Sequence, residues 1–180
     1  MPKYLQKNNV HQYFLTNIFS FSQIKPLLQQ LNINFMKWGI CRKHLCIDET
    51  IVPYFGRSSL KQFIRGKPVR FGFKMWCLAD ETGFCYQTSL YTGRDSQSTS
   101  TPLGSRVVNT FVTKCISSPD AVTLTFDNFF TSIELLSNLS TQGIRASGTV
   151  RKNRLHSVPL RTESEMKRSH HGAFDHRCNS

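Results

Sequence analysis

The sequence predicts an α/β protein whose mixed sheet contains three strands followed by an alternation of helix and strand. Two features carry this prediction. Residues 69–80 and 84–91 alternate apolar and polar side chains and are separated by a Glu-Thr-Gly turn, which is typical of a β-hairpin. Residues 102–150 then show the patterns of helix, strand, helix and strand in turn. With 39% hydrophobic and 12% aromatic residues in a chain of 180, disorder throughout is excluded.

The N-terminal part predicts one helix and one short strand. Leu27, Leu28, Leu31 and Phe35 recur at helical spacing, and Gly39 follows as a C-cap, so residues 1–40 form a lead-in that contains a helix. Residues 41–48 predict a short strand that ends in an acid. Residues 52–68 contain Pro, Gly and several cations, which predicts a long loop.

The hairpin that follows has two different faces. Phe71, Phe73 and Cys77 share one face with other apolar residues, and we interpret Cys77 as a small apolar core residue. The other face carries cations together with Trp76, which a covering helix could bury. The second strand of the hairpin covers residues 84–91.

The C-terminal half predicts two helices and two strands. Thr101-Pro102 fits an N-cap followed by Pro at the first helical position, and residues 103–116 carry one apolar stripe. Residues 121–126 form a strand that ends at an acid. A capping box at residues 131–134 starts the next helix, which stops at Gly143, and a last strand covers residues 144–150. We therefore expect the core at residues 41–154 and a polar, poorly ordered tail at residues 155–180.

Topology places two acids close together. Right-handed crossovers make the strands that begin near residues 41, 121 and 144 parallel and adjacent. Asp48 and Asp127 then leave the same carboxyl edge, where open α/β sheets bind ligands. Two such carboxylates are hard ligands that suit Mg²⁺ in two-metal phosphoryl transfer. The alternative is that each Asp only caps the next turn.

Positive charge is concentrated in two windows. The chain carries 23 Lys and Arg against 11 Asp and Glu, a net charge of +12. One window runs from Arg57 to Lys74 and the other from Arg145 to Arg161, and neither contains an acid. This predicts a polyanionic partner, and the alternative is a pair of solvated loops. The candidate DNA contacts are Arg57, Lys61, Arg65, Lys67, Lys74, Arg151, Lys152 and Arg154.

Seven local motifs resemble those of the piggyBac-type DDE transposases and come in that family's order. They are LCIDE (45–49), VPYFGR (52–57), KQFIRGKP (61–68), FGFK (71–74), YTGR (91–94), FDNFFTS (126–132) and GTVRKNR (148–154). The resemblance covers residues 21–177. It implies a ribonuclease-H-like fold, which agrees with the strand order predicted from the residues.

The resemblance also implies roles for particular residues. Asp48 matches the first catalytic Asp and metal ligand of the family, and Asp127 matches the second. The third Asp lies in a W-x-D-type segment downstream of a stretch like residues 172–175, and Ser180 comes just short of that segment. We do not assign Asp175 to this role. The implied cofactor is Mg²⁺, with Mn²⁺ as a substitute, bound weakly in this chain.

The partner implied by the resemblance is DNA, in the form of transposon ends and a TTAA target. The resemblance also implies a nuclear location and allows a homodimer.

The sequence shows no sign of a membrane or secreted protein. No apolar run approaches the roughly 18 residues of a membrane-spanning helix, and the N-terminus has no secretory layout. None of the six cysteines is paired as C-x-x-C. We therefore expect an intracellular chain with reduced thiols and no membrane association.

Three interpretations of function stay open at this stage. The first is a transposase core that keeps DNA binding but lacks catalysis, because only two of three metal ligands are present. The second is a domesticated DNA-binding or architectural protein in which the acids have no catalytic role. The third is a gene fragment with no independent role.

Overall fold

The computed structural model describes residues 24–40, 42–66, 68–93, 100–155 and 158–178. The chain divides into two compact units, Met1–Thr149 and Val150–Ser180, and each is described by itself. In the described part of the chain, no helix combines the length and the apolar character that crossing a membrane requires.

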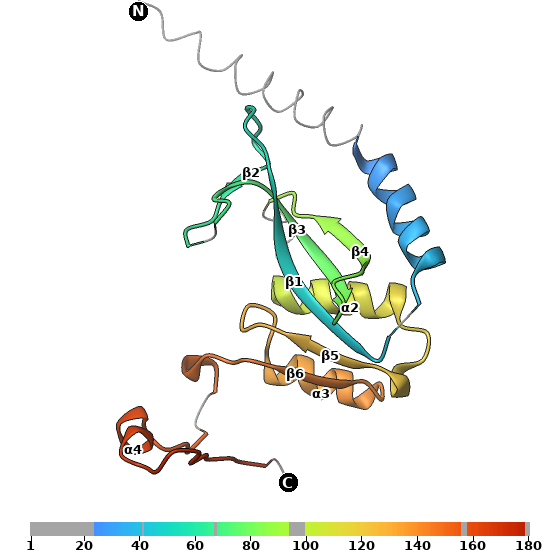
Figure 1. Cartoon of the computed structure of the whole chain (residues 1–180). Coiled ribbons are helices and arrows are strands. Elements are labelled where there is room, and N and C mark those ends of the chain that lie inside the picture. Colours follow the sequence, from blue (N-terminus) through green and yellow to red (C-terminus); the bar gives the residue numbers. More distant parts are fainter. Residues whose placement is uncertain (1–23, 41, 67, 94–99, 156–157, 179–180) are drawn as a thin grey trace, which may run out of the picture. The chain divides into compact units, whose positions relative to one another are not determined.

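A six-stranded mixed sheet forms the first unit (Figure 1). Its strands are β1 (His44–Pro53), β2 (Lys61–Phe63), β3 (Phe71–Asp80), β4 (Cys85–Leu90), β5 (Thr123–Phe126) and β6 (Arg145–Gly148). The order is β2-β3-β1-β5-β6, and β4 also pairs with β3. Strand β1 is parallel to β5, and β5 is parallel to β6, which confirms the predicted set of adjacent parallel strands.

The first strand is longer than the sequence predicted. Strand β1 does not end at Asp48 but continues to Pro53, because its antiparallel partner β3 pairs with it as far as Pro53 and Gly72. The predicted loop at residues 52–68 therefore contains the end of β1 and all of β2. Asp48 lies inside a strand, and only Asp127 directly follows the end of one.

Three helices of the first unit are described. The first covers residues 24–38 and ends where the Gly39 N–H donates to the Phe35 carbonyl at 2.8 Å. The others are α2 (Leu103–Cys115) and α3 (Ile133–Thr141). Their caps differ by one residue from the predicted ones: Pro102 caps α2, and the Ser132 hydroxyl caps α3 by accepting from the Leu135 N–H at 3.1 Å.

The two faces of the sheet have different surroundings. On the core face, side chains of β1, β3 and β5 form one buried cluster with α2 and α3; the strand residues are Leu45, Ile47, Trp76, Leu78, Leu124 and Phe126. We call the opposite side the open face. It carries Cys46, Asp48, Thr50, Phe73, Met75, Cys77, Thr125 and Ser147, which are exposed or half-buried.

The apolar alternation of β3 therefore gave a wrong prediction of which face of the strand is buried. Phe71, Phe73 and Cys77 lie on the open face, and Cys77 is only half-buried, whereas Trp76 is 3% exposed in the core. Alternation identifies two faces of a strand, but the face that is buried is the one that the helices cover. Trp76 packs edge-on against Phe130, which lies in the turn after β5, with ring centroids 5.5 Å apart.

A buried acid fixes the far end of the hairpin. The Asp80 carboxylate accepts hydrogen bonds from the Thr82 hydroxyl at 2.6 Å, the Tyr86 hydroxyl at 2.7 Å and two backbone N–H groups, and Arg42 lies 3.4 Å away. These hydrogen bonds, led by that of Thr82, lower the pKa of Asp80 to about 2. The turn is thus held by a carboxylate that stays ionised.

The second unit contains the short helix α4 (Glu163–Lys167) and the 3₁₀ turn η2 (Lys152–Arg154). No periodicity predicted α4. A capping box forms it: the Thr162 hydroxyl accepts from the Glu165 N–H, and the Glu165 carboxylate accepts from the Thr162 N–H at 2.7 Å.

Candidate metal centre and nucleic-acid interface

The two candidate metal ligands follow one another in the parallel register of β1 and β5. The last printed pair of this register is Ile47 with Phe126, and the next residues along the two strands are Asp48 and Asp127. Neighbouring strands lie about 4.8 Å apart, so the backbones of the two acids are neighbours. Asp48 is exposed on the open face, and Asp127 is half-buried.

Local hydrogen bonds hold one oxygen of each carboxylate. Asp127 Oδ1 accepts from the Phe129 N–H at 2.8 Å, and Asp48 Oδ1 accepts from the Glu49 N–H at 2.7 Å. The Asp127 carbonyl also accepts from the buried Thr131 hydroxyl at 2.8 Å. Asp127 therefore caps the turn after β5, as the alternative interpretation of this acid predicts. This cap orients the carboxylate through its Oδ1.

Close packing of α2 supports the same turn. A Cβ on Gly104 would lie 2.6 Å from the Phe129 carbonyl oxygen and 2.8 Å from the Phe130 Cα, so only glycine permits this approach. Helix α2 thus presses against the residues that directly follow Asp127. The position of the Asp127 carboxylate depends on the packing of two elements and not on its own strand alone.

Glu49 does not share a face with Asp48. The β1–β3 register pairs Glu49 with Trp76 on the core face and pairs Asp48 with Cys77 on the open face. Side chains alternate along a strand, so adjacent acids of β1 point to opposite sides. The Glu49 carboxylate therefore lies on the other face of the sheet from the Asp48 carboxylate.

Two acids of the second unit already have local partners. Asp175 accepts from the Arg161 N–H at 2.8 Å and pairs with Arg177, and these contacts lower its pKa in that order. The Thr162 backbone and hydroxyl lower the pKa of Glu165. Across the ranges that the structure describes, no group of three or more His, Cys, Asp and Glu side chains is arranged to hold a metal ion.

The first basic window is spread over both faces of the sheet. Arg57 and Arg65 are exposed in the loops on either side of β2. Lys61 belongs to β2, where its Nζ donates to the Gly56 carbonyl at 3.0 Å. Lys74 lies on β3 in register with Ile51, on the core face. Lys67 lies outside the described residues.

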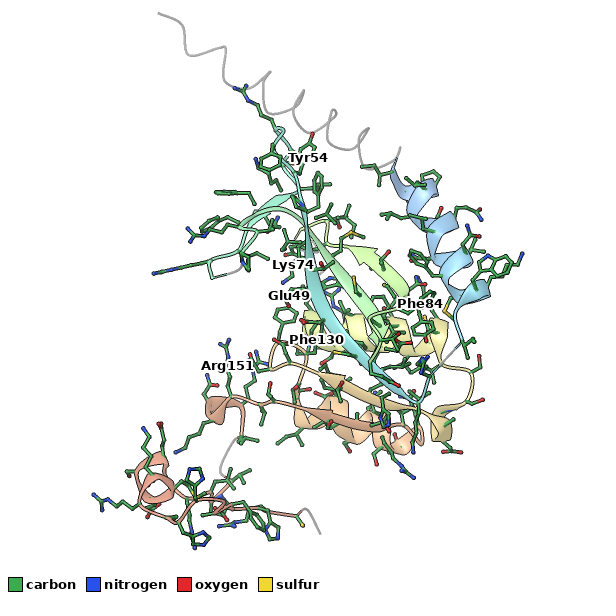
Figure 2. All side chains as sticks on the ribbon, in the orientation of Figure 1. Glu49, Tyr54, Lys74, Phe84, Phe130 and Arg151 are labelled. Carbon is green, nitrogen blue, oxygen red and sulfur yellow. The ribbon has the colours of Figure 1, made fainter. Side chains whose placement is uncertain are left out.

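Lys74 sits at the border of the aromatic core. Its Nζ lies 4.2 Å from the Trp76 ring centroid and 4.9 Å from that of Phe129, and these two rings are stacked with centroids 5.2 Å apart. Cation–π contacts of this kind hold the ammonium group over the rings. Figure 2 shows Lys74 next to Glu49 at the middle of the sheet, near Phe130.

The second basic window begins with Arg145 on β6 in the first unit, and its other cations lie in the second unit. Arg151, Lys152 and Arg154 are exposed around η2.

Sequence reasoning missed a group of exposed aromatic side chains. Tyr54, Phe55, Phe63 and Phe71 are all exposed between the end of β1 and the start of β3. The signal in the sequence is the interleaving of aromatic residues with the cations of the first window.

Known proteins resemble this chain over most of its length. The family model described as Transposase IS4 matches residues 12–180. The human PiggyBac transposable element-derived protein 3 is 39% identical over 166 residues, which cover 91% of this chain and 28% of that protein. The human PiggyBac transposable element-derived protein 2 is 34% identical over 170 residues, covering 87% of this chain and 27% of that protein.

One solved structure has the same fold. The cryo-EM structure of the piggyBac transposase synaptic complex with hairpin DNA superimposes with a TM-score of 0.69 at 25% identity, covering 94% of this chain and 34% of that one. This likeness confirms the predicted ribonuclease-H-like class of the mixed sheet. The chain spans about a third or less of the length of the relatives it matches.

Proposed function

The chain belongs to the piggyBac-type family of DDE transposases, and from this premise we propose that it binds DNA and holds Mg²⁺ between Asp48 and Asp127. One observation supports the proposal: the parallel register of β1 and β5 ends with Ile47 paired to Phe126, and each of these residues is followed by one of the two acids that match the family's motif. The solved relative is a complex with hairpin DNA, which supports DNA as the class of ligand. Transposon ends, TTAA targets and a nuclear location belong to the same proposal.

The donor set fits one magnesium ion. Carboxylate oxygens are the ligands that Mg²⁺ prefers, and a site of two carboxylates leaves room for the several waters that this ion keeps. Asp48 Oδ2 and Asp127 Oδ2 are the oxygens that we assign to it, since the Oδ1 atoms accept backbone N–H groups. When bound in pairs, such ions activate an attacking oxygen and stabilise a leaving one in phosphoryl transfer.

The basic window on β2 supplies the phosphate contacts in this proposal. Arg57 and Arg65 extend from the loops around β2, and no acid lies between Arg57 and Lys74 to compete for them. Each phosphate that a cation neutralises on duplex DNA contributes about −0.9 to the slope of log affinity against log salt. The part of DNA binding that these phosphate contacts supply is therefore salt-sensitive and tolerant of sequence.

The salt slope tests this proposal. Replacing Lys61, Arg65 and Lys67 by Ala weakens duplex binding and flattens the slope by up to about three units in a filter-binding titration. A matched variant replaces the exposed Lys25, Lys37 and Lys114, which lie outside both windows, and keeps the slope of the original chain. If the slope of the window variant is unchanged, or if both variants flatten the slope equally, the first basic window is a solvated loop that does not contact DNA.

We further propose that the 180-residue chain does not cut DNA. Two neighbouring Mg²⁺ ions repel each other, and two carboxylates carry too little negative charge to hold both. Purified chain incubated with Mg²⁺ or Mn²⁺ and DNA that carries the element's ends is expected to leave the DNA intact. Metal-dependent nicking that is lost in Asp127→Ala contradicts this and reveals a third ligand, with Asp175 and Glu165 the first to replace.

A further inference from the structure

The outer part of the sheet exposes aromatic rings together with cations. We call residues 52–73 the aromatic arm; it contains the end of β1, all of β2 and the start of β3. Phe55 is 97% exposed, Phe63 57% and Phe71 55%. Figure 2 shows Tyr54 among the side chains near the tip of β1, at the opposite end of the sheet from Phe84. A cluster of exposed apolar side chains is typical of an interaction site, whereas single exposed apolar side chains are common on any surface.

Four rings of the aromatic arm pack against one another in two pairs. Phe63 and Phe71 are cross-strand partners whose ring centroids lie 4.8 Å apart, and the Tyr54 and Phe73 rings lie 4.7 Å apart. The Lys61 Nζ lies 5.7 Å from the Phe71 ring centroid while it donates to the Gly56 carbonyl. The arm thus presents a preformed aromatic surface with a cation at its side.

A hollow lies beside these rings. Its volume is about 460 Å³, and the side chains that matter for binding are Tyr54, Phe55, Lys61, Arg70 and Phe71. Sites for small organic ligands measure roughly 300–1,000 Å³ and combine apolar walls with a few polar groups. The hollow has this size and this chemistry, because aromatic rings and two cations are among the residues that line it.

The charge of the segment selects the kind of ligand. No Asp or Glu occurs between Glu49 and Asp80, whereas Arg57, Arg65 and Arg70 are exposed in this stretch. A ligand that fits must offer flat apolar faces and negative charge together. Unpaired nucleotides do so, because each base can stack on an aromatic ring while its phosphate meets a cation, and every base has such a face.

The arm also lies on the same side of the sheet as the candidate metal ligand. Phe71 shares the open face with Cys77, the cross-strand partner of Asp48. Phe71 lies six positions before Cys77, which is about 20 Å along a strand at roughly 3.3 Å per residue. A DNA strand that passes Asp48 on the open face reaches the rings of the arm within a few nucleotides.

We propose that the aromatic arm binds unpaired nucleotides of DNA by stacking them on Phe63 and Phe71, about 20 Å from Asp48 on the open face. This inference rests on the proposed function and adds a ligand class to it: single-stranded nucleotides next to a duplex, and not duplex DNA alone. The cations hold the backbone of either form, and the rings discriminate between the two.

Two DNA probes separate these contributions. One is a plain duplex, and the other is the same duplex with a three-nucleotide single-stranded overhang. At fixed salt, the full chain binds the overhang DNA more tightly. Phe63→Leu combined with Phe71→Leu lowers affinity for the overhang DNA by about 5- to 100-fold and changes duplex affinity by less than about twofold. Phe71→Tyr keeps its ring and the preference, and Phe84→Leu, at the far turn, is the matched control.

A second measurement needs no variant. An overhang that carries 5-iodouracil is cross-linked to the full chain by light, and the peptide that contains residues 61–73 carries the label. Cross-links confined to other peptides overturn the proposal, as does equal affinity of the original chain for both probes. Loss of a dimer in the double-Leu variant with the overhang preference unchanged assigns the arm to a second copy instead. In each of these cases the proposed function is judged separately, by the salt slope of the variant that replaces Lys61, Arg65 and Lys67.

Discussion

Neighbouring residues of the same strands have opposite surroundings on the two faces of the sheet. On the core face, Ile47, Leu78 and Leu124 are at most 1% exposed, whereas one residue further along each strand Asp48 and Thr125 are exposed and Ala79 is half-buried. The core face determines whether the chain folds. The open face carries the residues that match the family's chemistry and is free to serve binding. Substitutions one residue apart therefore test different properties.

The largest expected effect comes from the core face. Leu124→Ala lowers the free energy of unfolding by about 2–5 kcal/mol, because it leaves a cavity among fully buried side chains. Thr125→Ala removes only one hydrogen bond, from its hydroxyl to the Leu45 carbonyl, and costs about 1 kcal/mol or less. Urea unfolding followed by circular dichroism measures both. Equal losses for the two variants contradict the division of the sheet into two faces.

The packing of α2 gives a smaller effect that reaches the open face. Gly104→Ala forces a methyl group against the backbone of Phe129 and Phe130 and lowers stability by about 1–3 kcal/mol. The turn that carries Asp127 must move to make room, so metal binding weakens as well. Ser105→Ala, one residue along the same helix, is the control for a general effect on α2. A Gly104→Ala variant as stable as the original chain shows that α2 does not press on this turn.

Acid pH probes the end of the hairpin. Asp80 has a pKa of about 2 in the folded chain, below that of an unfolded Asp near 4, so its stabilisation is present above about pH 4 and is lost as pH falls towards 2. Asp80→Asn lowers the melting temperature at pH 7, and the difference from the original chain shrinks between about pH 4 and pH 2. A difference that stays constant over this range means that the Asp80 carboxylate does not stabilise the fold.

The smallest effect on stability is expected at the acid pair. Asp48→Asn removes repulsion between neighbouring carboxylates, so without metal the melting temperature stays the same or rises slightly. With Mn²⁺ the original chain gains stability, and Asp48→Asn and Asp127→Asn lose that gain. Asp120→Asn, at an exposed acid away from the pair, keeps it. A gain of equal size in all four proteins shows that the ion binds elsewhere.

The course of the parallel strands could be predicted from the sequence, whereas the identity of the buried face could not. Periods of two and of 3.6, together with helix caps, indicated the hairpin and the crossovers, and these fix the neighbours β1, β5 and β6. The sequence does not say how far β1 extends, because its second half is held by pairing with β3 up to Gly72. The strand β2 and the exposed rings of Phe63 and Phe71 depend on the same long-range pairing.

Site-specific cross-linking tests most directly whether DNA lies on the open face. Ser147 is exposed on β6 on the open face, and Ser140 is exposed on α3, which covers the core face. Each serine is replaced in turn by the photo-reactive residue benzoyl-phenylalanine, and Thr50, two residues from Asp48, is a second open-face position. We expect cross-links to duplex DNA from Ser147 and Thr50 and background levels from Ser140. Strong cross-linking from Ser140 with none from the open-face positions contradicts the account.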